Sequence, residues 1–202
     1  LISNITHEFK TPIATISTAI EGISSFNADN NKEKTERYLG ISSDQLKKLN
    51  TMVEKLLETA TIDSGELDVS KSSCDLVMMT RQVVDQFQLT MGDKQIRLYL
   101  PEESILFEVD GFHMENVLSN LIDNALKYGG DLISVRLTSR GAHPLWEVED
   151  NGGHIEKSQR EKIFEKLYRI PKGNRHDVKG FGIGLYYTRA IIEKHGGTIH
   201  LE

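Results

Sequence analysis

A short stretch near the start of the chain places an imidazole, a carboxylate and a hydroxyl within five residues: His7, Glu8 and Thr11, followed by Pro12. Residues four apart are neighbours on an α-helix, so His7 and Thr11 share one face. Pro12 has no N–H to bond the Glu8 carbonyl, which predicts a bend just after the histidine. The cluster indicates a chemical role for the imidazole, and a surface histidine that happens to precede a proline is the alternative.

A second group of polar residues recurs with helical spacing. Asn116, Asn120 and Asn124 are four residues apart and form one amide stripe. Asn is a poor helix former, so three in register favour a polar ligand. An amide oxygen suits Mg²⁺, and the ammonium of Lys127 suits phosphate. A solvated helix face is the alternative.

Two glycine-containing turns complete the candidate chemistry. Asp150 ends a predicted strand and is followed by Asn-Gly-Gly, where a flat ring can approach a backbone that has no side chain. A carboxylate there can accept from an exocyclic amino group, although any tight turn has this composition. Gly180, Gly182 and Gly184 open a helix, and backbone N–H groups at such a start favour phosphate. A purely structural turn is the alternative for this loop too.

The composition is that of a globular domain or two, with 202 residues, 38% hydrophobic and 27% charged. The net charge of −6 argues against a nucleic-acid partner. Cys74 is the one cysteine of the sequence, which excludes an internal disulfide. No run is apolar enough for a membrane span, so we expect no membrane contact by this fragment. Both ends interrupt regular patterns, which indicates a piece of a longer protein.

The elements that must position the first cluster are two long helices. Apolar residues recur every three or four positions over 1–26 and again over 32–62, with a polar turn between them. This predicts an antiparallel hairpin. Two helices cannot enclose both stripes, so a second copy is expected to complete a four-helix bundle. Packing of the hairpin on the rest of its own chain is the alternative.

The second half has α+β periodicity, with a mixed sheet covered on one face by helices. Gly65 is the expected end of the second helix. Strands are predicted at 66–70, 95–100, 105–109, 132–139, 144–149 and 198–202, and helices at 75–91, 111–128, 158–167 and 182–195, with 168–180 irregular.

Together these stretches resemble the core of a sensor histidine kinase. Residues 3–12 are similar to the H box, 120–128 to the N box, 150–155 to the first glycine motif, 163–169 to the F box and 180–185 to the second glycine motif. The five motifs occur in the family's order and span nearly the whole chain. The resemblance implies a dimerisation and phosphotransfer domain over 1–63. It implies a Bergerat-type α/β sandwich that binds ATP over 64–202, truncated at its C-terminus.

The resemblance also implies roles for individual residues. His7 corresponds to the phosphoacceptor, Glu8 to the group that polarises its imidazole, and Thr11 to the residue that positions water in the reverse reaction. Asn124 corresponds to the Mg²⁺ ligand, and Asp150 to the acceptor for the adenine amino group. The full implied nucleotide site is Asn120, Asn124, Lys127, Tyr128, Asp150, Gly152, Arg169, Gly180, Gly182 and Gly184.

The implied function is ATP- and Mg²⁺-dependent phosphorylation of His7, then transfer to an aspartate of a response-regulator receiver domain, with phosphatase activity. The implied partners are a second copy and that regulator. The implied location is the cytoplasm, with the parent protein anchored in the inner membrane. His154 and Leu167 depart from the family pattern, where glycine and phenylalanine are usual. His154 motivates the alternative of a nucleotide-impaired or phosphatase-biased member, and an ATPase clamp is a further alternative.

Overall fold

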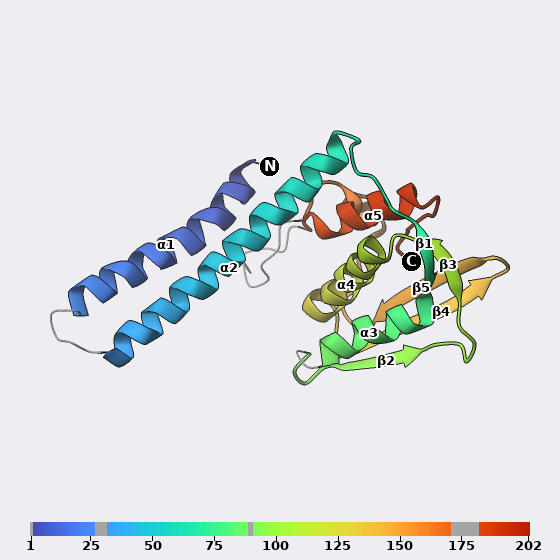
Figure 1. Ribbon diagram of the computed structural model, residues 1–202, viewed down its shortest axis with the longest axis horizontal. Helices are drawn as coiled ribbons and strands as arrows, with labels where there is room; N and C mark the ends of the chain where they lie inside the picture. The colour runs from blue at the N-terminus through green and yellow to red at the C-terminus, as the bar shows by residue number, and fades with distance from the viewer. Residues whose placement is uncertain (1, 27–31, 89–90, 171–181) are drawn as a thin grey trace. The chain divides into compact units, whose positions relative to one another are not determined.

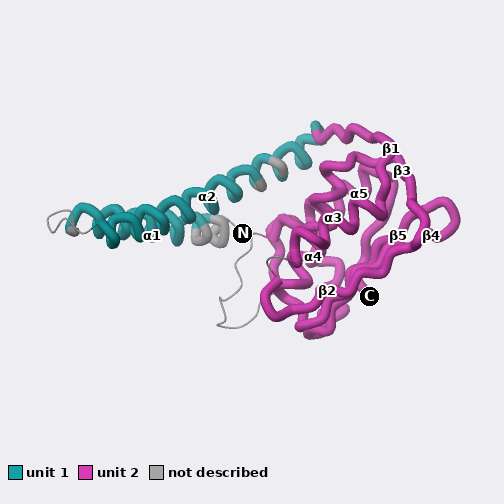
Figure 2. The backbone as a smooth tube through the Cα atoms, turned by 60° about the horizontal axis from the view of Figure 1, so that its bottom comes forward, with its two compact units in different colours: residues 1–66 teal, residues 67–202 magenta. Residues whose placement is uncertain are grey.

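The computed structural model describes residues 2–26, 32–88, 91–170 and 182–202 of the chain. These residues divide into two compact units, residues 1–66 and 67–202, which Figure 2 colours separately. Figure 1 shows a helical hairpin in the first unit and a mixture of strands and helices in the second. Each unit is described by itself.

The first unit is the hairpin that the apolar periodicity predicts. Helix α1 spans Ile2–Phe26 and runs through Pro12, and helix α2 spans Lys32–Asp63 (Figure 1). Small or flexible side chains are buried between them, including Ala19 and Met52. Gly22 allows a close approach, because a Cβ there would lie 3.3 Å from the ring of Tyr38. The bend after His7 stays a prediction.

Much of the apolar stripe of this unit remains in contact with solvent. Six large side chains are between 45% and 62% exposed: Ile13, Ile20, Leu39, Leu46, Val53 and Leu57. They lie along the apolar stripes of the two helices, which two helices alone are not expected to enclose. Apolar side chains that are exposed in periodic order along a helix pair are typical of a face that packs against another protein surface. The hairpin alone therefore leaves its apolar positions unsatisfied.

Helix α2 ends where the sequence predicts. Gly65 adopts φ +74, a conformation that glycine reaches without strain. Its N–H donates to the carbonyl of Ile62 at 3.1 Å, and the N–H of Ser64 donates to Ala60 at 3.0 Å. These bonds satisfy carbonyls that the last helical turn leaves without partners. The expectation of Gly65 as the C-terminal cap is confirmed.

The second unit contains two small sheets. Strands β2 (Gln95–Tyr99), β4 (Leu132–Arg140) and β5 (His143–Asp150) form a mixed sheet in the order β2-β4-β5. Strand β2 runs parallel to β4, and β5 runs antiparallel to it. Strands β1 (Ser72–Asp75) and β3 (Leu106–Val109) form a separate antiparallel pair. The expected α+β class with a mixed sheet is confirmed.

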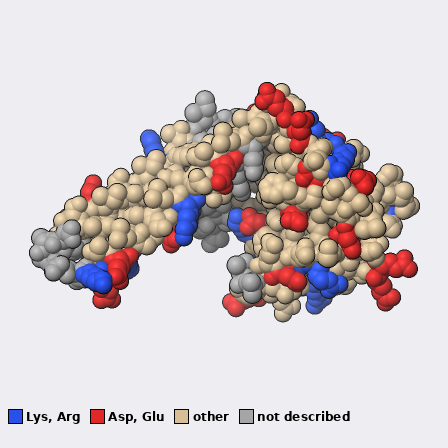
Figure 3. Space-filling model, in the orientation of Figure 1, with Lys and Arg blue, Asp and Glu red and all other residues tan. Residues whose placement is uncertain are grey.

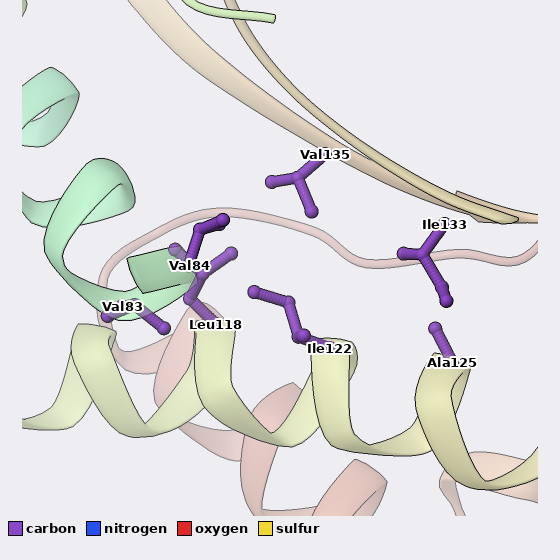
Figure 4. Packing of buried hydrophobic residues seen from close by; sticks show 7 residues of the cluster. All are labelled: Val83, Val84, Leu118, Ile122, Ala125, Ile133 and Val135. Carbon is purple, nitrogen blue, oxygen red and sulfur yellow. The ribbon is translucent and has the colours of Figure 1, made fainter. Parts of the chain in front are cut away.

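Helices pack on the three-stranded sheet. These are α3 (Leu76–Gln88) and α4 (Gly111–Tyr128), with α5 (Gly184–Lys194) against α4 (Figure 1). Figure 4 shows the cluster that joins two helices to strand β4, all of its side chains pointing into a shared interior. Its members are Val83, Val84, Leu118, Ile122, Ala125, Ile133 and Val135. This apolar layer buries one face of α4. The asparagines of the amide stripe are not part of it.

Three predicted elements are wrong. Residues 66–70 alternate like a strand, yet β3 pairs with Ser72–Asp75 instead. The N–H of Ser70 donates to the carboxylate of Asp110 at 2.8 Å rather than to a strand carbonyl. Residues 198–202 also alternate without forming a strand. Alternation predicts a strand only where a neighbouring strand offers hydrogen bonds, and neither segment has that neighbour among the residues described.

The third incorrect element is the predicted helix over 158–167. The structure has two 3₁₀ turns there, η2 (Lys157–Gln159) and η3 (Lys162–Phe164). Neither turn has a side-chain cap, and so short a segment does not sustain an isolated α-helix. Its position depends on tertiary contacts, because Phe164 is buried and the guanidinium of Arg189 lies 4.3 Å from the centre of its ring.

The N-terminus of α4 is fixed by Asp110. Its carboxylate accepts from the N–H of His113 at 3.1 Å and from the N–H of Ser70 at 2.8 Å. Its own N–H donates to Nε2 of His195 at 2.9 Å, and Nδ1 of His195 lies 2.8 Å from the carbonyl oxygen of Ile191. Both contacts fit the neutral imidazole with its proton on Nδ1. The network joins the start of α4 to the end of α5.

We expect Asp110→Ala to lower the free energy of unfolding by about 1–2 kcal/mol at pH 7, the usual effect of losing an N-cap. Burial raises the pKa of this carboxyl, but the backbone donors of His113 and Ser70 outweigh it, so the pKa lies below 3.8. A carboxyl with a lowered pKa stabilises the fold fully above its unfolded value and loses that effect as the pH falls through the folded value.

Urea unfolding of both proteins between pH 7 and pH 2 tests this prediction. The advantage of the wild type is expected to shrink below a pH of about 3.8, the ordinary value of the carboxyl. Asp68→Ala removes an exposed carboxylate and serves as the control. A difference between wild type and Asp110→Ala that does not change with pH would contradict the electrostatic part of the account.

Charged side chains are interspersed over the face shown in Figure 3, where neither sign forms a continuous field on the residues described. Within the described ranges, no helix combines the length and the apolar character that crossing a membrane requires.

Candidate nucleotide site and phosphoacceptor helix

The centre of the candidate site is the carboxylate at the end of β5. Asp150 is the last residue of that strand and is exposed. The N–H of Gly152 donates to its Oδ1 at 2.8 Å, which fixes one oxygen and the direction of the side chain. Among the residues that the structure describes, no other donor bonds to this carboxylate, so its second oxygen can accept a hydrogen bond from a ligand.

Three glycines pack closely around Asp150 and its neighbour Asn151. A Cβ on Gly152 would lie 2.6 Å from Oδ1 of Asp150 and 2.6 Å from the Cα of Gly129. A Cβ on Gly129 would lie 2.5 Å from Cγ of Asp150, and one on Gly130 would lie 2.2 Å from Oδ1 of Asn151. No side chain fits at these distances. The turn after α4 and the turn after β5 are therefore interlocked.

Asn151 ties the same two turns together. Its Oδ1 accepts from the N–H of Leu132 at 2.9 Å, and its Nδ2 donates to Oδ1 of Asp131 at 2.8 Å. The hydrogen bond from Asn151, with one from the backbone N–H of Asp131 itself, holds the pKa of the Asp131 carboxyl below its ordinary value. Asn151 thus has a structural role beside Asp150.

The amide stripe lies on α4 as predicted. Asn116, Asn120 and Asn124 are all half-buried. The described residues contain no group of three or more His, Cys, Asp and Glu side chains that could hold a metal ion. A Mg²⁺ ion at Asn124 would accordingly take one amide oxygen from the protein, and phosphate oxygens and water fit its remaining positions.

Two other predicted ligands follow the amide stripe at the end of α4. The ammonium of Lys127 lies 2.5 Å from Oδ2 of Asp123, one turn earlier on the same helix. Both side chains of the pair are more than a third exposed, so the pair adds little stability. Tyr128, the last residue of the helix, is exposed as well.

The second glycine motif is described from Gly182 onward, and Gly180 lies outside the described residues. Gly182 has φ +67, and a Cβ there would lie 2.5 Å from the carbonyl oxygen of Tyr168. Its carbonyl accepts from the N–H of Leu167 at 2.9 Å. Gly184 begins α5, and a Cβ on it would lie 3.4 Å from Oδ1 of Asn120. The motif is thus joined to both the F-box segment and the amide stripe.

His154 and Leu167, the two departures from the family pattern, differ in backbone conformation. Among the non-glycine residues described, Leu167 alone has a positive φ, +62. His154 is exposed and lacks that conformation, so its backbone is unstrained. A bulky residue in the left-handed region costs about 1–2 kcal/mol. The strain lies at Leu167, and the exposed Arg169 follows two residues later.

The predicted phosphoacceptor residues lie in α1. The side chains of His7 and Glu8 are outside the described residues, so only their helical backbone is placed. Thr11 is exposed, and its carbonyl accepts from Oγ1 of Thr15 at 3.0 Å. Pro12 is buried, which places the neighbouring Thr11 at the edge of a packed helix.

Sequence reasoning missed part of this site. Gly129 packs against the carboxylate as closely as Gly152 does, and Gly130 packs against Asn151, so the glycine doublet directly after the helix was a usable signal. Asp131, which holds Asn151, gave no signal in the sequence. The guanidinium of Arg189 lies on Phe164 and donates to Glu161 at 3.0 Å, which joins α5 to the turns before Leu167.

Comparison with known proteins assigns both units to families. Residues 1–65 match the His Kinase A (phospho-acceptor) domain, and residues 109–202 match the histidine kinase-, DNA gyrase B- and HSP90-like ATPases. Sensor protein RprX of Bacteroides fragilis is 35% identical over 100% of this chain and 40% of its own length. Sensor histidine kinase WalK of Bacillus subtilis is 28% identical over 98% of this chain and 33% of its own. The chain thus spans less than half of these relatives.

Solved structures share the fold. The histidine kinase AdeS of Acinetobacter baumannii aligns with 93% of this chain and 86% of its own, with a TM-score of 0.68 at 22% identity. The histidine kinase ThkA, solved with the response regulator protein TrrA, aligns with 100% of this chain and 56% of its own, with a TM-score of 0.72 at 22% identity. The chain therefore belongs to the sensor histidine kinases of two-component signal transduction, with their phospho-acceptor domain followed by their ATPase domain.

Proposed function

We propose that this chain transfers the γ-phosphoryl group of ATP to a ring nitrogen of His7. The group then passes to an aspartate of a response-regulator receiver domain. The observation that carries the proposal is the pair of interlocked glycine turns that leave the Asp150 carboxylate open. Gly129 and Gly152 both lie so close to this carboxylate that neither position has room for a side chain, and this packing holds the carboxylate in one place for a ligand.

The adenine ring is the ligand that this carboxylate suits. Asp150 can accept from the exocyclic amino group with the oxygen that Gly152 leaves open. The absence of side chains at Gly129 and Gly152 lets the two turns pack against the carboxylate, which would then face the ring from a fixed position. Tyr128 would lie against the nucleotide.

The phosphates would extend from this ring towards α4 and α5. Asn120 and Gly184 adjoin each other, which supports a shared phosphate subsite. Asn124 would bind Mg²⁺, which neutralises charge on the phosphates, and Lys127 would add a cation after leaving Asp123. Gly180, Gly182 and Arg169 complete the proposed lining.

At the acceptor, neutral imidazole supplies the electron pair that forms the new N–P bond. The bond from the γ-phosphorus to the bridging oxygen breaks, and ADP leaves with that electron pair. Glu8 would accept a hydrogen bond from the other ring nitrogen and so select the tautomer that attacks. Thr11 would position water for removal of the phosphoryl group from the regulator, the proposed phosphatase activity. The acceptor and the nucleotide site belong to separate units, so transfer requires His7 of one unit to meet the γ-phosphate held by the other.

We propose further that residues 1–63 dimerise and that residues 64–202 bind the nucleotide. The periodic apolar side chains that the hairpin leaves exposed support a second copy that completes a four-helix bundle. The relatives are about two to three times as long as this chain. We propose a parent sensor anchored in the inner membrane, with these residues in the cytoplasm; the greater length of the relatives leaves room for a sensor and an anchor.

Calorimetric titration with ADP and Mg²⁺ tests the nucleotide site. We expect the wild type to bind and Asp150→Asn to bind about tenfold more weakly, since a charged acceptor is worth more than a neutral one. Glu149→Gln changes an exposed neighbour and is the matched control. Equal affinity for all three proteins, or no binding by the wild type, would contradict the proposal. His154 has no positive φ, so backbone strain at this position is not an argument for impaired binding, and the same titration measures its affinity directly.

A further inference from the structure

Lys94 lies just before β2 and is half-buried at the end of α4. Its ammonium donates to the carbonyl oxygen of Leu126 and, at 3.2 Å, to that of Gly129. The last carbonyls of a helix have no partners within the helix. A lysine far away in the sequence therefore closes the end of the helix that carries the amide stripe.

The second of these carbonyls belongs to the turn around Asp150. The N–H of Gly129 donates to Ala125 at 2.9 Å while its carbonyl accepts from Lys94, so both of its polar groups are held. This fixed Gly129 is the residue whose Cα faces Gly152 and whose missing side chain makes room for the Asp150 carboxylate. Lys94 thus fixes the Gly129 turn that packs against the carboxylate, without contacting the carboxylate itself.

Asp131 connects the residue after Lys94 to the turn that follows Asp150. The N–H of Gln95, next to Lys94, donates to the carbonyl of Asp131 at 2.8 Å. The carboxylate of Asp131 accepts from Nδ2 of Asn151, which is adjacent to Asp150. The start of β2 therefore holds both turns, one through a side chain and one through the backbone.

We propose that Lys94 is a positioning residue for recognition of the purine: it fixes the Gly129 turn so that the Asp150 carboxylate meets the exocyclic amino group of adenine. The inference rests on the proposed role of Asp150. It predicts that losing Lys94 reduces the preference for adenine over a purine without that amino group, rather than nucleotide affinity in general.

The test compares the affinities of the full chain for ADP and for IDP, which carries a carbonyl oxygen in place of the amino group. The wild type is expected to prefer ADP. In Lys94→Met we expect this preference to fall about tenfold, roughly the value of one hydrogen bond. Lys94→Arg keeps a cationic donor and is expected to restore most of the preference. Lys194→Met removes an exposed lysine from the last turn of α5 and is the control.

The outcomes separate this inference from the function on which it rests. If the wild type binds ADP and IDP equally, the proposed role of Asp150 fails and the inference fails with it. If the wild type prefers ADP and Lys94→Met retains the preference, or loses affinity for both nucleotides in parallel, the positioning role alone is overturned. Parallel loss would indicate that Lys94 only stabilises the fold.

Discussion

Gly152→Ala is expected to weaken ADP binding by about a hundredfold, because the new methyl group displaces the carboxylate. This loss of affinity is larger than the loss expected from removing one hydrogen bond. Its Cβ would lie 2.6 Å from Oδ1 of Asp150, from the Cα of Gly129 and from the N of Gly130. Two of these contacts are backbone atoms, which cannot rotate away. The turn after β5 must move, and the carboxylate moves with it.

The adjacent residue provides the matched control. A Cβ on Gly153 would meet no atom within 4 Å, so Gly153→Ala adds the same methyl group in open space. We expect its affinity for ADP, measured by calorimetry, to stay within about twofold of the wild type, as for an ordinary surface substitution. Circular dichroism on both variants checks that the fold persists. Similar binding by the two variants would refute the interlocked-turn account of the site.

His7→Gln is expected to lower phosphorylation of the chain by about a thousandfold or more, because its amide cannot serve as the nucleophile. ADP affinity is expected to be unchanged, since His7 lies in the other unit from the nucleotide site. The measurement is transfer of radiolabel from ATP to protein in the presence of Mg²⁺.

Two further variants make that result specific. His143→Gln removes an exposed histidine at the start of β5 and is expected to label like the wild type. Thr11→Ala is expected to label normally while losing the dephosphorylation of a phosphorylated receiver domain. Steady release of phosphate that is insensitive to His7→Gln would instead favour an ATPase clamp.

Apolar and amide periodicity predicted helix α4 over 111–128, and the structure adds the local residues that end it. Asp110 is an N-cap residue, the amide and apolar stripes have helical spacing, and glycines follow Tyr128. The hairpin strands β4 and β5 were equally clear, because alternation flanks Gly141, which adopts φ +65. Where the capping residue, the periodicity and the turn residues all favour the same element, tertiary packing does not change the structure that the local sequence favours.

The incorrect elements depended on contacts remote in sequence. Ser70 lies opposite Asp110, forty residues away, and this partner replaces the strand neighbour that the alternation needs. The turns around Phe164 depend on Arg189 in another helix. No periodicity within the segment itself contains that information.

The candidate site divides in the same way. The residue types that could contact a nucleotide were readable from the sequence, because an amide stripe, a carboxylate and glycines are chemically distinctive. The residues that hold this site in place were not readable from the sequence. Lys94, for example, donates to the backbone carbonyl of Gly129, 35 residues away, and every residue has such a carbonyl. The acceptor histidine was found from its neighbours and stays a prediction.

The central claim is that ATP phosphorylates this chain on His7, and mapping the phosphoryl group tests it most directly. The wild type is incubated with ATP and Mg²⁺, digested at neutral pH to preserve an acid-labile N–P bond, and analysed by mass spectrometry. The account predicts a single phosphorylated peptide with the group on His7, lost on brief acid treatment. A protein that binds ADP but carries no phosphoryl group, or carries it on another residue, would contradict the account.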